Sequence, residues 1–102
     1  MRLYERTGRH ADLARLLAAV PTPEDRRERL VLHRRRASVA RTLGDRAGVV
    51  ANLRRVLDDA PADPEALPEV ERDLRVRGAL EELRDRLRAA AQESAAEVTA
   101  LG

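Results

Sequence analysis

Arginine is the residue in this sequence with the largest capacity for specific binding chemistry. The chain has 20 Arg, no Lys and 18 acidic residues, so its formal net charge is only +2 although its pI is about 10.3. A guanidinium group holds a carboxylate or a phosphate through two parallel hydrogen bonds. The arginines therefore predict either recognition of anionic groups or, more simply, a compositional preference of the genome.

Nucleophiles and metal ligands are sparse. The chain has no Cys, and its two histidines, His10 and His33, lie 23 residues apart without a carboxylate at metal-ligand spacing. Neither histidine has a Ser or Cys partner suited to nucleophilic catalysis, and no glycine-rich phosphate loop is present. The sequence therefore predicts that the protein is not an enzyme, that it uses no metal or cofactor, and that both histidines are structural.

Charge is distributed unevenly along the chain. Residues 24–46 hold eight Arg and four acids, whereas residues 58–73 hold seven acids and one Arg. In one interpretation the two segments form ion pairs between neighbouring helices, Arg34, Arg35 and Arg41 with Glu65, Glu69 and Asp73. In a second interpretation the basic segment binds a partner. Nucleic-acid binding is a third, but three consecutive arginines on a helix point in three directions and no aromatic side chain lies beside them.

Three glycines mark a repeat that would position these side chains. Gly8, Gly44 and Gly78 are separated by 36 and 34 residues, and apolar residues follow each of them at 5, 9 and 12 positions. These residues are Leu13, Leu17 and Val20; Val49, Leu53 and Val56; and Leu83, Leu87 and Ala90. The spacing is one stripe of an amphipathic helix. Each glycine is therefore predicted to end one helix and to open the next.

The pattern predicts helices over residues 10–20, 24–43, 46–59, 64–77 and 79–91, with residues 1–7 forming the last turns of a further helix. Thr22, Asp45 and Asp63 are the predicted N-caps, while Pro21 and Pro61 stop the helices before them. The tail from Gln92 onwards either extends the last helix or forms a short capping helix.

The segment Leu43-Gly44-Asp45 resembles the second half of a tetratricopeptide repeat when read with the residues after it: Val49, Leu53, Val56, Leu57 and Pro61. Residues 8–20 and 78–91 show the same resemblance, although the repeats are degenerate. The resemblance implies an all-α fold of antiparallel helical hairpins, stacked as a short right-handed α-solenoid. It divides a single domain of residues 1–102 into a partial repeat (1–21), two repeats (22–61 and 62–92) and a C-terminal cap or tail (93–102).

The resemblance also implies a function, because tetratricopeptide arrays serve as protein-interaction modules and scaffolds. Ligands of that family usually lie along the concave face made by the first helix of each hairpin. In this sequence the register places these residues on that face: Arg2, Arg6, Arg34, Ser38, Arg41, Arg72 and Arg75. Arg35 is a substitute for Arg34, because the longer second hairpin shifts the register by up to one residue. We therefore expect an acidic segment of a partner protein as the ligand. The alternative is an architectural spacer or a fragment of a longer helical-repeat protein.

Two further expectations concern the surroundings of the chain. No run of residues approaches 18 apolar positions, and the first residues lack the apolar core of a signal peptide, so a cytoplasmic location without membrane contact is predicted. Residues 1–7 supply only about two helical turns. The stripe of Leu13, Leu17 and Val20 should therefore stay partly uncovered. We expect this end to meet another chain or to be continued by further residues.

Overall fold

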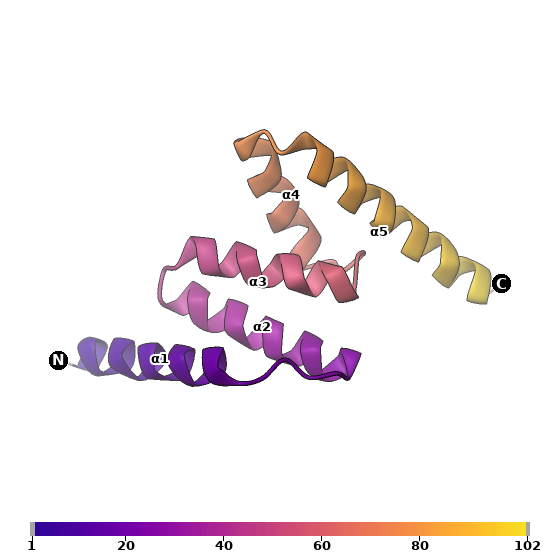
Figure 1. Ribbon diagram of the computed structural model, residues 1–102. Helices are drawn as coiled ribbons and strands as arrows, with labels where there is room; N and C mark the ends of the chain where they lie inside the picture. The colour runs from indigo at the N-terminus through magenta and orange to yellow at the C-terminus, as the bar shows by residue number, and fades with distance from the viewer. Residues whose placement is uncertain (1, 102) are drawn as a thin grey trace. The chain divides into compact units, whose positions relative to one another are not determined.

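A computed structural model describes the backbone of residues 2–101 and the side chains of residues 9–96. The described chain is helical throughout, with turns between the helices (Figure 1). Its helices are α1 (Arg2–Ala19), α2 (Arg26–Thr42), α3 (Arg46–Asp59), α4 (Ala66–Arg77) and α5 (Leu80–Leu101). The chain divides into two compact units between Asn52 and Leu53, inside α3. The predicted all-α class is confirmed, and the right-handed solenoid stays a prediction.

In the first unit, α1 packs against α2, and the chain reverses direction between them (Figure 1). Helix α2 begins at Arg26, where the carboxylate of Asp25 accepts a hydrogen bond of 3.0 Å from the backbone N–H of Glu28. The predicted N-cap at Thr22 is therefore wrong. A carboxylate is favoured over a hydroxyl at this place because it also interacts with the positive end of the helix dipole.

The turns at Gly44 and Gly78 have the same geometry. Both glycines adopt the left-handed conformation, with φ of 71° and 72°. The N–H of Gly44 donates to the carbonyl of Arg41 and the next N–H donates to Ala40, at 3.1 and 2.8 Å. The N–H of Gly78 donates to Arg75 and the next N–H donates to Leu74, at 3.2 and 2.9 Å. Two Schellman motifs thus recur 34 residues apart, as the glycine spacing predicts.

The predicted turn at Gly8 does not exist. Helix α1 runs without a break from Arg2 to Ala19, so Gly8 lies inside it. A glycine inside a helix costs only about 1 kcal/mol relative to alanine. Asp45 follows Gly44 and accepts a 3.0 Å hydrogen bond from the N–H of Gly48, whereas neither Arg9 after Gly8 nor Ala79 after Gly78 offers a capping side chain. Because the cost of a glycine inside a helix is small, α1 continues through Gly8.

In the second unit, α4 packs against α5. One stripe of α4, formed by Ala66, Val70 and Leu74, is fully buried. Glu65, not the predicted Asp63, occupies the N-cap position of α4, but the carboxylate of Asp63 accepts hydrogen bonds from the N–H groups of Glu65 and Ala66, at 3.2 and 2.9 Å. Helix α5 reaches Leu101, and the tail therefore extends the last helix.

The three apolar stripes differ in burial. Val49, Leu53 and Val56 are all buried, and Leu53 is only 7% exposed. In the third stripe Leu83 and Ala90 are buried, whereas Leu87 is partly exposed. In the first stripe Leu13 is 43% exposed and Val20 is 41% exposed. The predictions of a buried Leu53 and of a partly uncovered first stripe are both confirmed.

Candidate partner-binding surface

Helix α2 has one buried side and one exposed basic side. Its buried residues are Leu32, His33, Ala37, Val39 and Ala40. The four residues predicted on this helix to bind a partner are all exposed: Arg34, Arg35, Ser38 and Arg41. Three of them follow one another at spacings of four and three residues, so they share one stripe of the helix. We call these four residues the basic face of α2.

The other predicted binding residues lie elsewhere in the chain. Arg72 and Arg75 are exposed on α4, in the second unit, where Arg75 forms a 2.7 Å ion pair with Glu71. Arg2 and Arg6 belong to α1, but their side chains lie outside the described residues. A continuous row of arginines across three hairpins would span both units and stays a prediction. The predicted pairing of the α2 arginines with acids of residues 58–73 also stays a prediction.

Arg36, although adjacent to the basic face, has a different role. Its guanidinium group donates to the carbonyl of Leu17 from Nε and from a terminal nitrogen, at 3.0 and 2.6 Å, and to the carbonyl of Val20 at 3.0 Å. The last carbonyls of a helix lack partners within the helix and lie at its negative end. Arg36 therefore caps the C-terminus of α1 and ties it to α2. The sequence could not separate this arginine from its two neighbours in the run of three.

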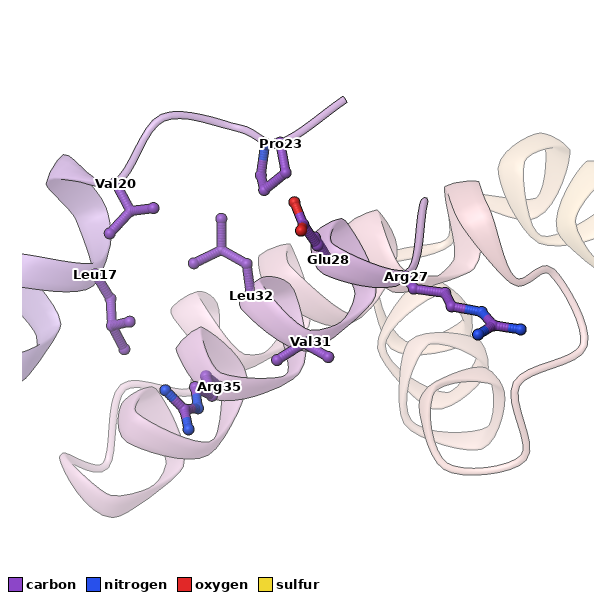
Figure 2. A pocket seen from close by; sticks show the side chains of 8 residues that line it. All are labelled: Leu17, Val20, Pro23, Arg27, Glu28, Val31, Leu32 and Arg35. Atoms are coloured by element: carbon purple, nitrogen blue, oxygen red, sulfur yellow. The ribbon is translucent and has the colours of Figure 1, made fainter. Parts of the chain in front are cut away.

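An open groove lies between the end of α1 and the beginning of α2 (Figure 2). Its volume is about 450 Å³. The residues that line it are Leu17, Val20, Pro23, Arg27, Glu28, Val31, Leu32 and Arg35. Five of these eight side chains are apolar, and Val31 is 55% exposed. We call this feature the α1–α2 groove.

Two arginines fix the walls of this groove. Arg36 holds the end of α1, which carries Leu17 and Val20. Arg29 donates to the carbonyl of Pro23 at 3.4 Å and to the carbonyl of Glu24, and so holds the connector that forms another wall. Both sets of contacts come from α2 itself, which therefore positions the other two walls of the groove.

Sequence reasoning missed most of this groove. Val31 lies in a strongly basic segment, and the glycine-anchored stripe does not include it. The available signal was the spacing Arg27, Val31, Arg35, in which an apolar residue has an arginine one turn away on each side. Arg35 is the residue that belongs both to the predicted binding set and to the groove.

The second unit contains an ionic network at partly exposed positions. Glu82 on α5 accepts hydrogen bonds from Arg54 on α3, at 2.8 and 2.5 Å, and from Arg86 at 2.8 Å. Arg86 also contacts Asp58 at 3.3 Å. Partial desolvation of Glu82 acts to raise its pKa, but the hydrogen bonds from Arg86 and Arg54 outweigh it and lower the pKa below the ordinary value. Each group has a partner within the network, which therefore joins α3 to α5 rather than offering a site.

The histidines do not form a site. His33 is buried in α2, and His10 is half-buried in α1. Across the described residues, no cluster of three or more His, Cys, Asp or Glu side chains has a geometry that could hold a metal ion. Among those residues, too, no helix combines the length and the apolar character needed to cross a membrane.

Fold and surface together define an all-helical protein that presents a basic helix face beside an open apolar groove. No protein-family model, curated protein or solved structure matches the chain.

Proposed function

We propose that this chain is a protein-interaction module that binds an acidic segment of a partner protein through α2. The observation that carries the proposal is the basic face of α2, where Arg34, Arg35, Ser38 and Arg41 are all exposed beside an apolar groove. Guanidinium groups bind carboxylates with two parallel hydrogen bonds, and nearby apolar side chains add hydrophobic contact. The surface thus combines both components of a protein interface.

The repeated turns support a scaffold of the tetratricopeptide kind. The Schellman motifs at Gly44 and Gly78 share their φ angle and their hydrogen bonds, and each one joins two helices. A chain built from such hairpins works by presenting surfaces rather than by enclosing a reaction centre. We therefore propose a binding protein that acts in the cytoplasm and catalyses no reaction.

The placement of charge favours a protein ligand over a nucleic acid. Arg29 and Arg36 donate to backbone carbonyls in the same unit, so these two guanidinium groups are used within the fold. Acidic residues also lie at the start of the same helix, at Glu24, Asp25 and Glu28, where they would repel a phosphate backbone. A ligand with a few separate carboxylates fits this mixed surface better than a uniform polyanion.

The double change Arg34→Glu with Arg41→Glu tests the proposal. The probe is a set of fluorescein-labelled acidic peptides, some helical and some extended, with basic peptides and duplex DNA for comparison. The double variant should lose binding of the acidic peptides by at least about tenfold, which corresponds to roughly 1.4 kcal/mol. Arg55→Glu with Arg88→Glu is the matched control, because both residues are exposed in other helices.

Circular dichroism should show equal helicity for the two double variants. Undiminished peptide binding by the folded Arg34→Glu, Arg41→Glu variant would contradict the proposal. Tight, strongly salt-dependent binding of duplex DNA without binding of acidic peptides would contradict it too.

A second candidate function is an architectural segment of a longer helical-repeat protein. Exposed apolar residues of α1 and its end favour it, since Leu16 is 67% exposed and Leu13 and Val20 are also uncovered. Such a stripe is what one hairpin offers to the next in a stacked array. Analytical ultracentrifugation tests this: association through α1 should disappear in Leu13→Glu with Leu16→Glu, and a strict monomer at high concentration would argue against it.

A further inference from the structure

We infer that the α1–α2 groove binds an amphipathic helix of the partner, with apolar side chains in the groove and two carboxylates directed at Arg27 and Arg35. This inference rests on the proposed function and adds to it the place, the conformation and the residue pattern of the ligand.

The apolar component comes from both helices and from their connector. Figure 2 shows Leu17 and Val20 facing Leu32 and Val31 across the groove, with Pro23 near one end. Val31 and Val20 are exposed to solvent by 55% and 41%. Apolar surface that a partner removes from water contributes favourably to binding, against the costs of association. The groove therefore favours a ligand with several adjacent apolar side chains.

The charged component selects the chemistry of that ligand. Arg27 and Arg35 lie one helical turn before and after Val31, and Glu28 is the one acid that lines the groove. Arg34 and Arg41 continue the basic surface along the same helix. The rim thus carries a net positive charge, which complements a ligand with carboxylates beside its apolar residues and disfavours a basic ligand.

The spacing along α2 selects a helical ligand. Arg27 and Arg35 are eight residues apart, which corresponds to about 12 Å along a helix axis. A partner helix that lies along α2 brings side chains seven or eight positions apart to the same separation. Its apolar residues at i, i+3, i+4 and i+7 then face the groove between the two carboxylates. An extended peptide would cover this length in about four residues, too few to hold four apolar side chains between the two carboxylates.

The walls are positioned before binding. Arg36 holds the end of α1 through the carbonyls of Leu17 and Val20, and Arg29 holds the connector through the carbonyl of Pro23. A groove that needs no rearrangement loses less free energy on binding than one that must form.

Fluorescence anisotropy with the full chain tests the inference. The probe is a labelled peptide of about 18 residues, long enough to form a helix, with Leu at i, i+3, i+4 and i+7 and Glu on each side of the stripe. Val31→Asp should weaken its binding by at least about tenfold, since a charge enters the apolar contact. Val76→Asp is the matched control, because Val76 is an 81% exposed valine on α4.

Charge reversal gives the second readout. Arg35→Glu should weaken binding of the Glu peptide, and a peptide with Lys at the facing positions should regain affinity for this variant. A peptide with the same composition but a scrambled stripe should bind weakly to every variant.

The outcomes separate the inference from the proposed function. Suppose that acidic peptides bind and that Arg34→Glu with Arg41→Glu abolishes binding. If Val31→Asp and Arg35→Glu then have no effect, the groove is not the binding site and the proposed function stands. Equal binding of scrambled and extended acidic peptides overturns the helical ligand. If no acidic peptide binds, both proposals are overturned.

Discussion

Two helices of this protein carry the same apolar pattern and use it differently. Val49, Leu53 and Val56 on α3 are all buried, whereas Leu13 on α1 and Val20 just after its end, at the equivalent positions, are more than 40% exposed. The amphipathic pattern is the same in both helices, so the pattern alone does not decide burial. The difference shows that a stripe of this kind becomes either core or contact surface according to its surroundings.

The turns provide the physical reason for the difference. At Gly44 the chain reverses through a left-handed glycine, and the carboxylate of Asp45 caps the helix that follows. At Gly8 the helix continues, so no reversal there brings a preceding helix back over Leu13 and Val20. One end of α1 instead borders an open groove, which Arg36 holds in place.

The largest difference between the two regions should appear on truncation of their leucines. Leu53→Ala should lower the free energy of unfolding by about 2–5 kcal/mol, because it leaves a cavity. Leu16→Ala should change it by less than about 0.5 kcal/mol, because this side chain is mostly exposed. Urea denaturation followed by circular dichroism measures both. Equal losses in the two variants would show that Leu16 is also part of a core.

The attachment of α1 should depend on Arg36. Arg36→Gln removes charge-assisted hydrogen bonds to the carbonyls of Leu17 and Val20 and should cost about 1.5–3 kcal/mol. Arg35→Gln, one residue away and exposed, should cost less than about 0.5 kcal/mol. Hydrogen exchange should show that the backbone of α1 loses protection in the first variant only. Similar exchange in both variants would mean that Arg36 does not hold this helix.

Alanine substitutions of the glycines should change stability in opposite directions. Gly44→Ala and Gly78→Ala should each destabilise by about 1–2 kcal/mol, since an alanine is strained in the left-handed conformation. Beyond the adjacent residues, no described heavy atom lies within 4 Å of an added Cβ at either place, so the cost comes from the backbone conformation. Gly8→Ala should stabilise by up to about 1 kcal/mol, because Gly8 is inside a helix. Thermal melts would contradict this account if Gly8→Ala were as harmful as Gly44→Ala.

The smallest expected effect concerns acid. The lowered pKa of Glu82 means that its contribution to stability is fully present above the ordinary pKa of about 4.5 and is lost as the pH falls through the lower folded-state pKa. Glu82→Gln should therefore reduce the acid sensitivity of unfolding by less than about 1 kcal/mol, as for partly exposed ion pairs. Arg36 contacts carbonyls that do not titrate, so Arg36→Gln should leave the pH profile unchanged. Denaturation at a series of pH values between neutral and strongly acidic checks both statements.

The sequence predicts most of the helical framework. The left-handed turns at Gly44 and Gly78 follow from glycine at a helix end, and the helix-start hydrogen bonds of Asp45 and Asp63 follow from carboxylates before an apolar stripe. Gly8 fits the same spacing, but α1 continues through it without a turn. The spacing predicts a turn at all three glycines, whereas left-handed φ angles and turn hydrogen bonds are found at Gly44 and Gly78.

The candidate site is less predictable from sequence, because it depends on which side chains the fold itself uses. Arg34, Arg35 and Arg36 are identical in type, and only the position of the α1 carbonyls assigns Arg36 to the fold. The groove depends on how the connector between α1 and α2 runs, and Arg29 fixes this through the carbonyl of Pro23. Helical periodicity in the sequence predicts neither the contacts of Arg36 nor the path of this connector.

Chemical-shift mapping by NMR tests the central claim most directly. The isotopically labelled chain is titrated with the amphipathic acidic peptide, and backbone amide shifts are followed. The account predicts that the largest shifts cluster around the α1–α2 groove, at Leu17, Val20, Val31 and Arg35, and that the amides around Val76 on α4 stay unchanged. Shifts centred on α4 and α5, or no shifts at saturating peptide, would contradict it.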